Sequence, residues 1–392
     1  MQNTCLGNKQ KKIKITTILY ISIAMITVLL NVLAWNSTAF CDAYIFLVFP
    51  LWVNTYGRLT GIFPFSVGEW LLVAGAMLVI LAVLMIPVFL LFRKTRHRLF
   101  GFYRFLAWVV LIICMIMTLN CSILYHVTPF SEKYIAEGSG EETEKVELLF
   151  LIRNMVVEKC NVLSKQVERN AEGVPVYSED SEKMGQKARI AMKQLGRVYA
   201  QLDGWYPTPK PLLASDFVSQ QYMAGYYFPF SMEANYNDVM NDLQKPATMC
   251  HELAHLRGYI LEDEANFIGY LACVQSEDAF FEYSGYLSVL NYLNNDLLTL
   301  ARKNPTIYAK VLRKHALSKL DPIVREDNIF VSDAEWDRIN QKAWFDTGAV
   351  DAAADVYLDV TLKANGVPDG KISYCRVVEH LLDYYATRRD EL

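Results

Sequence analysis

The chain has 392 residues, of which 53% are hydrophobic, and its mean hydropathy is positive, which excludes a disordered chain and is unusual for a wholly soluble protein. Residues 1–126 carry 10 basic and 2 acidic side chains, whereas the remainder carries 28 and 40, a net charge of −12. This acidity excludes a nucleic-acid surface, because binding phosphates needs an excess of Lys and Arg.

Three uncharged segments, 15–35, 70–92 and 105–125, can each cross about 30 Å of hydrocarbon as a helix. The first exceeds the apolar core of a cleaved signal peptide, which is the alternative interpretation. Basic residues precede the first segment and fill the link between the other two: Lys9, Lys11, Lys12, Lys14, Arg93, Lys94, Arg96 and Arg98. The positive-inside rule places these clusters in the cytoplasm. We therefore expect a multi-pass protein of the cell membrane with a cytoplasmic N-terminus and residues 127–392 outside.

A further uncharged stretch, 43–57, lies between the first two segments. It is only 15 residues long and contains Pro50, so we expect an interfacial or re-entrant piece. A fourth span here is the alternative, and it would invert the orientation of residues 127–392.

Residues 127–392 are numerous enough for a substantial core. Apolar spacing predicts helices over 144–169 and 181–202. Residues 205–237 are rich in Pro, Tyr and Phe, which predicts short strands such as 210–214 and 224–230. Helical pattern returns at Pro246. We therefore expect an α-helical membrane anchor over 1–126, followed by a mainly α (α+β) domain with a small sheet before its central helix.

The central helix contains the pattern H-E-x-x-H, formed by His251, Glu252 and His255. Histidines four apart lie on one face of a helix, so both imidazoles can reach one Zn²⁺ ion. Glu252 is the next residue along the helix and points beside the face of the two histidines, where it can take a proton from water as a general base. The alternative is a chance pair of surface histidines. The eight cysteines form no C-x-x-C pair, so other residues must complete the site.

A catalytic zinc ion usually has three protein ligands. In an unbroken helix Glu262 would lie about 10 Å beyond His255, out of reach of the same ion. We expect Gly258 to end the helix with a positive φ and Glu262 to begin a second helix as the third ligand. Glu264 is the rival ligand, and Asn266 lies one turn after Glu262. An acidic first turn that suits the helix dipole is the structural alternative.

The segment Glu262-x-x-Ala265-Asn266 resembles the Glu-x-x-Ala-Asp segment of gluzincin metallopeptidases, with Asn266 in place of the Asp that supports a histidine. Gly258 is similar to the glycine of the metzincin pattern, but Leu261 replaces its third His. Most of the chain resembles a bacterial family known as domain of unknown function 3810, through GYYFPFSMEANYND, HELAHLRGYILEDEANFIGYLAC, EYSGY and LKANGVPDGKISYCRVV. That resemblance implies a membrane-anchored, zincin-like protein and no established substrate.

Other candidates surround the motif. Residues 225–230 precede the motif helix, so they predict either an edge strand that pairs with an extended substrate, with Tyr227 as a candidate for contact with substrate or oxyanion, or a buried core strand. Tyr283, Tyr286 and Tyr374 could each donate to a developing oxyanion, although a lone Tyr more often packs in a core.

These features together predict a zinc-dependent metallopeptidase that acts on a peptide or protein at the lipid bilayer. A zincin-like module that binds metal or peptide without turnover is the alternative, and hydrolysis of another amide, such as cell-wall peptide, is a third. Retention of Glu252 favours an enzyme.

Overall fold

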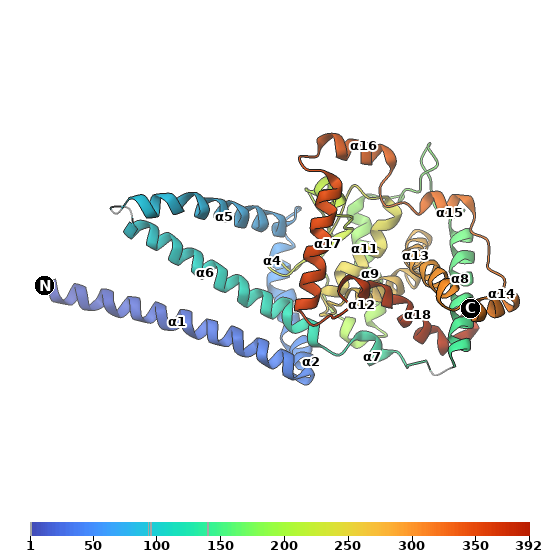
Figure 1. Cartoon of the computed structure of the whole chain (residues 1–392), viewed down its shortest axis with the longest axis horizontal. Coiled ribbons are helices and arrows are strands. Elements are labelled where there is room, and N and C mark those ends of the chain that lie inside the picture. Colours follow the sequence, from blue (N-terminus) through green and yellow to red (C-terminus); the bar gives the residue numbers. More distant parts are fainter. Residues whose placement is uncertain (1, 93, 95, 139–140) are drawn as a thin grey trace.

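The computed structural model describes residues 2–92, 94, 96–138 and 141–392 (Figure 1). The chain is mostly helical, with apolar helices at the N-terminus and one small sheet. Helices α1, α5 and α6 extend to one side of the rest of the molecule, which forms a packed body (Figure 1).

The N-terminal region consists of seven helical elements within the described residues: α1 (Gln2–Asn36), α2 (Thr38–Leu47), α3 (Phe49–Trp52), the π-turn η1 (Val53–Gly57), α4 (Arg58–Thr60), α5 (Val67–Leu91) and α6 (Arg96–Asn120). Four stretches of the described chain are long and apolar enough to cross a membrane: Ile15–Asn36, Thr38–Thr60, Val67–Leu91 and Arg96–His126. The first, third and fourth coincide with the predicted spans. These apolar helices indicate membrane association.

The stretch Thr38–Thr60 is the one that the sequence placed at the interface. It is a nearly continuous helical segment, but one face packs against the second region instead of lying free. Gln201 donates to the carbonyl of Ile45 over 3.2 Å, and Thr60 Oγ1 donates to the carbonyl of Ser231 over 2.7 Å. In Figure 1, α2 and α4 lie where α1, α5 and α6 meet the packed body. These contacts join the stretch Thr38–Thr60 to the second region, and both interpretations of it, interfacial segment and fourth span, stay predictions.

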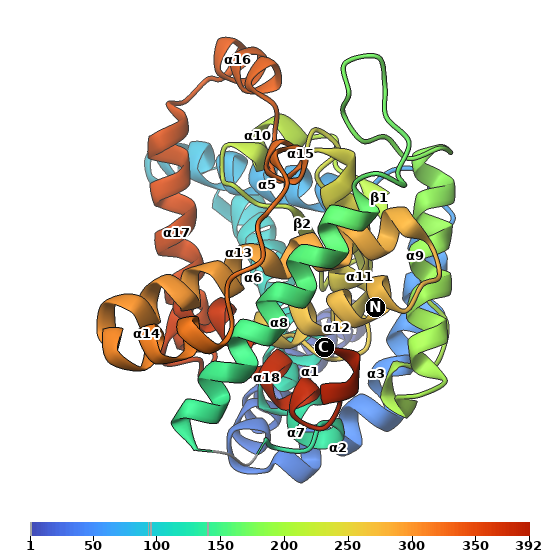
Figure 2. The ribbon, with the colours of Figure 1, turned by 90° about the vertical axis from the view of Figure 1, so that its right-hand side faces the viewer.

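The helices of the second region surround a central trio, α11 (Lys245–His255), α12 (Glu262–Val274) and α13 (Ala279–Lys303). Helices α8 and α18 lie toward the viewer in Figure 2, and α13 crosses behind α8. The remaining helices and 3₁₀ turns are η2 (Ser122–His126), α7 (Phe130–Tyr134), α8 (Glu142–Leu163), α9 (Ser181–Gly196), η3 (Ala200–Leu202), α10 (Ser215–Ser219), η4 (Asp242–Gln244), α14 (Pro305–Lys314), α15 (Pro322–Asp327), α16 (Asp333–Lys342), α17 (Thr347–Ala364), η5 (Gly370–Arg376), α18 (Val377–Ala386) and η6 (Arg389–Glu391). Helices α8 and α9 lie where the sequence predicts them, and each ends before its predicted boundary.

Two glycines let the central helices approach closely. A Cβ on Gly269 of α12 would lie 3.0 Å from the carbonyl oxygen of Ala247 in α11. A Cβ on Gly285 of α13 would lie 2.7 Å from Cβ of Cys273 in α12. The trio therefore packs backbone against backbone, which fixes the relative positions of the side chains that α11 and α12 present.

The sheet has three strands, β1 (Lys210–Pro211), β2 (Gly225–Phe228) and β3 (Glu233–Tyr236), in the order β1-β3-β2. β1 is parallel to β3, and β2 is antiparallel to it. The sequence predicted β1 and β2 with longer bounds but not β3, which is buried along its whole length. β2 is thus an edge strand of this sheet, and it contacts the motif helix α11.

A buried ion pair joins this sheet to the membrane helices, and we call it the junction pair. Lys210 of β1 and Glu233 of β3 are 2.5 Å apart at Nζ and Oε1. Lys210 also donates to the carbonyls of Thr60 and Phe65, over 2.8 Å and 3.0 Å. Glu233 Oε2 accepts from the backbone N–H of Gly68, 2.8 Å away, at the start of α5. A carboxylate there satisfies a free N–H and suits the helix dipole.

Candidate metal centre

Helix α11 presents the two histidines of the motif to one point. Pro246 lies in its first turn, and the N–H of Ala247 donates to Ser284 Oγ of α13 over 3.1 Å, which anchors the start of the helix. His251 and His255 are one turn apart, and their Nε2 atoms are 3.1 Å from each other. The helix therefore aims both imidazoles at the same small volume.

The chain reverses directly after His255, as the sequence predicted. Helix α11 ends at His255, and Gly258 has a φ of +91°, a conformation that favours glycine. Its N–H donates to the carbonyl of His255 over 3.0 Å, and α12 begins at Glu262. A Cβ on Gly258 would also lie 3.0 Å from Cγ2 of Ile45 in α2, so the turn is packed against the stretch Thr38–Thr60.

This reversal brings Glu262 to the histidines. Its Oε2 lies 3.1 Å from His251 Nε2 and 4.0 Å from His255 Nε2. Ligand atoms on a tetrahedral zinc ion are roughly 3.3–3.6 Å apart, which follows from bonds of about 2.0–2.2 Å. The three atoms therefore form a triangle of the size that one zinc ion requires. We call His251, His255 and Glu262 the ligand triangle.

The outer nitrogen of each ring has an acceptor. His255 Nδ1 lies 2.8 Å from the carbonyl oxygen of Tyr259, which can only accept, so Nδ1 carries the proton. His251 Nδ1 lies 2.9 Å from Asn266 Oδ1, which assigns that ring the same tautomer. When neutral, each imidazole directs an unprotonated Nε2 into the triangle. Two facing lone pairs and a carboxylate oxygen form a donor set that fits a cation such as zinc.

Glu252 lies beside the triangle without closing it. One ligand atom each of His251, Glu252 and His255 lies within 4.8 Å of the other two. Glu252 Oε2 is buried and accepts no hydrogen bond from the described residues. Gly225 of β2 leaves room for this carboxyl group, because a Cβ on Gly225 would lie 2.6 Å from Glu252 Oε1. Burial raises the pKa of Glu252 to about 8. An unpaired carboxyl group in this position fits a proton acceptor better than a structural group.

The protonation of the triangle also suits metal binding. Burial, followed by the charge of His251, lowers the pKa of His255 to about 4, so its ring is neutral at neutral pH. Burial alone would raise the pKa of Glu262, but a hydrogen bond with His251, the nearby His255 and Tyr374 hold it below the usual range. Burial lowers the pKa of His251, but the same hydrogen bond and the charge of Glu262 together raise it, so without an ion this ring carries a proton on Nε2, which a metal would displace. A neutral imidazole and an ionised carboxylate are the forms that bind zinc.

The other acidic residues of the first turn of α12 point elsewhere. Glu264 accepts from Ser131, from its N–H over 3.0 Å and from its hydroxyl over 2.5 Å. Asp263 lies 3.0 Å from Arg376 Nε and 3.4 Å from His380 Nε2. Glu264, the rival ligand, is thus directed away from the triangle.

The fold places the four candidate tyrosines, Tyr227, Tyr283, Tyr286 and Tyr374, at different distances from the triangle. Tyr374 of η5 lies close enough to Glu262 to lower the pKa of that carboxyl group. Tyr227 packs its ring 5.9 Å from that of His255, and its hydroxyl donates to the carbonyl of Asn120 over 3.0 Å. Tyr283 donates to Asp327 over 2.7 Å, and Tyr286 stacks edge-on against Tyr270 at 5.9 Å. Neither Tyr283 nor Tyr286 is brought to the triangle among these contacts.

Two contributors were not predicted from the sequence. Gly225 makes room for Glu252, and the carbonyl of Tyr259 orients His255. Tyr259 lies four residues after His255, so the expected reversal at Gly258 could have indicated its carbonyl. Gly225 comes from a distant segment and has no local signal.

The fold and the ligand triangle define a membrane-associated, mostly helical protein with a buried histidine–carboxylate cluster. The chain belongs to the family described as "Protein of unknown function (DUF3810)", whose model matches residues 44–382. The family indicated by the sequence motifs is thus confirmed, and the match includes α5, α6 and the cluster. No curated protein and no solved structure matches the chain. The likeness to zincins stays a prediction.

Proposed function

We propose that this protein is a membrane-anchored, zinc-dependent peptidase of the zincin type. The observation that carries the proposal is the ligand triangle, with two Nε2 atoms 3.1 Å apart and Glu262 Oε2 3.1 Å from one of them. Without a cation, burial lowers the pKa of His251 but the hydrogen bond and charge of Glu262 raise it, so a proton on His251 Nε2 takes the place that an ion would fill. His251, His255 and Glu262 would hold the ion, while Asn266 and the carbonyl of Tyr259 keep the rings in place.

Zinc in such a site supplies a Lewis acid, which polarises a carbonyl and acidifies water. Glu252 Oε2 would accept the proton of the attacking water as its oxygen bonds to the peptide carbonyl carbon. The same carboxyl would then return this proton to the amine as the C–N bond breaks. Its buried, unpaired position and its pKa of about 8 suit both transfers.

A peptide is the substrate class that the surroundings favour. β2 is an edge strand, and its Gly225 lies against Glu252. An extended peptide could pair with the free edge of this strand and present its carbonyl beside Glu252. The basic residues near the first span and between the other two favour an extracytoplasmic site.

The second candidate is a non-catalytic module that binds metal or peptide. It is favoured by the enclosure of the triangle, since the His251 and Glu262 side chains are only 13% and 18% exposed. A peptidase would need an opening by which an extended chain reaches these residues.

The purified full-length protein, loaded with zinc, tests the proposal on a mixed library of fluorogenic peptides. We expect Glu252→Gln to keep its zinc, because the residue is not in the triangle, and to lose roughly two to four orders of magnitude in turnover. His251→Ala should lose both zinc and turnover. Turnover by Glu252→Gln equal to that of the parent would refute the general base, and zinc binding without any cleavage by the parent would favour the binding module.

A further inference from the structure

Helix α17 has an exposed face that carries no charge over most of its length. The exposed positions from 349 to 360 recur at helical spacing and are all apolar or aromatic: Ala349, Ala352, Ala353, Val356, Tyr357 and Val360. Val356, Tyr357 and Val360 are 64%, 73% and 60% exposed. We call these residues the α17 stripe. An exposed apolar surface of this kind marks a site of contact with a partner or a membrane.

The acidic residues of α17, Asp351, Asp355 and Asp359, lie off this stripe, and Lys363 follows it one turn further along the helix. Asp355 forms an ion pair with Lys371, and Asp359 bonds Lys363 over 2.7 Å. Asp355 and Asp359 therefore pack toward η5 or along the flank of the helix. This separation gives α17 one polar flank and one apolar face, as in helices that lie flat on a bilayer.

The C-terminal end of α17 is held at the base of α1. The loop after α17 contains Gly366, where a Cβ would lie 3.4 Å from the ring of Trp35 and 3.3 Å from that of His126. Trp35 is the penultimate residue of α1, and His126 ends the 3₁₀ turn after α6. This end of α17 is thus at the level where two membrane helices leave the apolar region.

The N-terminal end of α17 is held near the start of α5. Gln220, at the end of α10, donates to the carbonyl of Phe345 over 3.1 Å and to Thr347 Oγ1 over 2.9 Å. Just before α10, the N–H groups of Leu213 and Ala214 each donate to Glu69, in the first turn of α5, over 2.9 Å. Both ends of α17 are therefore tied to the bases of membrane helices, and Figure 1 shows α17 running across the ends of these helices.

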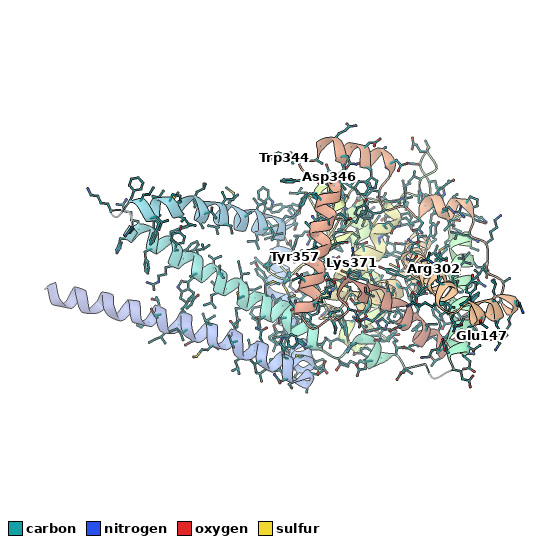
Figure 3. All side chains as sticks on the ribbon, in the orientation of Figure 1. Glu147, Arg302, Trp344, Asp346, Tyr357 and Lys371 are labelled. Carbon is teal, nitrogen blue, oxygen red and sulfur yellow. The ribbon has the colours of Figure 1, made fainter. Side chains whose placement is uncertain are left out.

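Exposed apolar side chains continue from α5 to the α17 stripe. Leu213, beside Glu69, is exposed, and so is Phe217 of α10. Phe217 lines one shallow pocket together with Trp344 and Phe345, which are 93% and 67% exposed. Figure 3 shows Trp344 and Tyr357 on the side of the packed body from which the long helices extend, whereas Glu147 and Arg302 lie toward the opposite end.

We propose that the α17 stripe, together with Trp344 and Phe345, lies in the headgroup layer of the same bilayer that holds α1, α5 and α6. The surface is continuous with the lipid-facing surface of α5, and aromatic side chains of this kind are enriched at the membrane–water interface. The α17 stripe needs no basic residues to attract it to the bilayer, because α1, α5 and α6 already hold the chain at the bilayer surface. η5, which follows α17, carries Tyr374, so the docked segment also reaches the ligand triangle.

Depth-dependent quenching in proteoliposomes tests this proposal on the full-length chain. A fluorophore is attached to the new cysteine of Val356→Cys in a protein whose Cys5, Cys114 and Cys375 are replaced by Ser. The same protein without the new cysteine measures the fluorescence that comes from labelling of the remaining cysteines. Val162→Cys is the matched control, because Val162 is a 54% exposed valine on α8. Figure 1 shows α8 at the end of the packed body opposite the long helices. Vesicles of phosphatidylcholine with headgroup-proximal nitroxide lipids supply one quencher, and aqueous iodide supplies the other.

We expect nitroxide lipids to quench position 356 at least about threefold more strongly than position 162, and iodide to show the reverse order. Equal quenching by iodide at both positions would overturn the proposal, because the stripe would then face water. Protection of position 356 from both quenchers would also overturn it and would assign the stripe to a second copy or another protein. Unchanged thermal melting of both labelled proteins verifies that neither substitution disturbs the fold.

Discussion

The junction pair and the ligand triangle are both buried polar clusters, but they differ in how far their polar atoms are satisfied. The Lys210 ammonium has three acceptors, namely Glu233 and the carbonyls of Thr60 and Phe65. In the second cluster, the Nε2 atoms of His251 and His255 face each other, and Glu252 Oε2 has no partner among the described residues. Leaving a buried polar group unpaired costs about 1–3 kcal/mol, so a protein retains such groups where a ligand completes them. The comparison therefore supports a structural role for the junction pair and the proposed function for the triangle.

Glu233→Ala tests the structural side of this comparison and has the largest expected effect. It would leave the Lys210 ammonium buried without its carboxylate and free the N–H of Gly68. Removing one partner of a buried pair costs about 3–5 kcal/mol in the free energy of unfolding. Thermal and denaturant melting of the full-length protein in detergent would measure the loss.

Glu69→Ala is the control for that variant. Glu69, at the start of α5, also accepts from two backbone N–H groups, those of Leu213 and Ala214, but it is only partly buried and forms no buried ion pair among the described residues. We expect it to cost about 1 kcal/mol or less. If the two substitutions destabilised the protein equally, the junction pair would not be the main link between the sheet and the membrane helices.

Gly225→Ala tests the functional side by moving Glu252 without changing it. The new methyl group would lie 2.6 Å from Glu252 Oε1 and from the carbonyl oxygen of Asn235, so the carboxyl must shift. A misplacement of about 1 Å can cost about a hundredfold in rate, and the triangle itself should keep its zinc. Peptide turnover and zinc content of the same preparation would be measured together.

Gly75→Ala is the matched glycine control, since a Cβ there would meet nothing within 4 Å. Its turnover should equal that of the parent. Full turnover by Gly225→Ala would show that Glu252 is not held by β2, and the assignment of its role would fail.

Gly258→Val sharpens the comparison at the turn that joins the two histidines to Glu262. A left-handed conformation costs a residue with a side chain about 1–2 kcal/mol, and here the new side chain would also meet Ile45. Gly173→Val shares the positive φ, but its Cβ would meet nothing within 4 Å. Gly258→Val should therefore destabilise the protein more than Gly173→Val in thermal melting, and it alone should lower zinc affinity. If the two variants lost the same thermal stability and the same zinc affinity, the turn at Gly258 would have no specific role in the ligand triangle.

The sequence predicted those features that depend on neighbouring residues. The apolar lengths predicted α1, α5 and α6, and the spacing of His251 and His255 with the glycine at 258 predicted the helix, its reversal and the approach of Glu262. All of these contacts lie within a few helical turns of the chain, so periodicity and backbone preference determine them.

The remaining features depend on contacts between distant segments. β3 is paired on both sides and buried throughout, so it lacks the alternation that marks a half-exposed strand. The junction pair joins residues 23 positions apart, and Glu233 reaches Gly68 across 165 positions. Tyr374 could be named from the sequence only as one tyrosine among several. Its selection over Tyr283 and Tyr286 depends on how η5 packs against α12.

Zinc content of the purified full-length protein and two variants tests the central claim most directly. We expect about one zinc ion per chain in the parent, since three protein ligands are the usual number for a catalytic ion. Glu262→Ala should lose most of this zinc. Glu264→Ala should keep it, because Glu264 bonds Ser131 instead of facing the triangle. Full zinc in Glu262→Ala, or loss confined to Glu264→Ala, would contradict the ligand triangle.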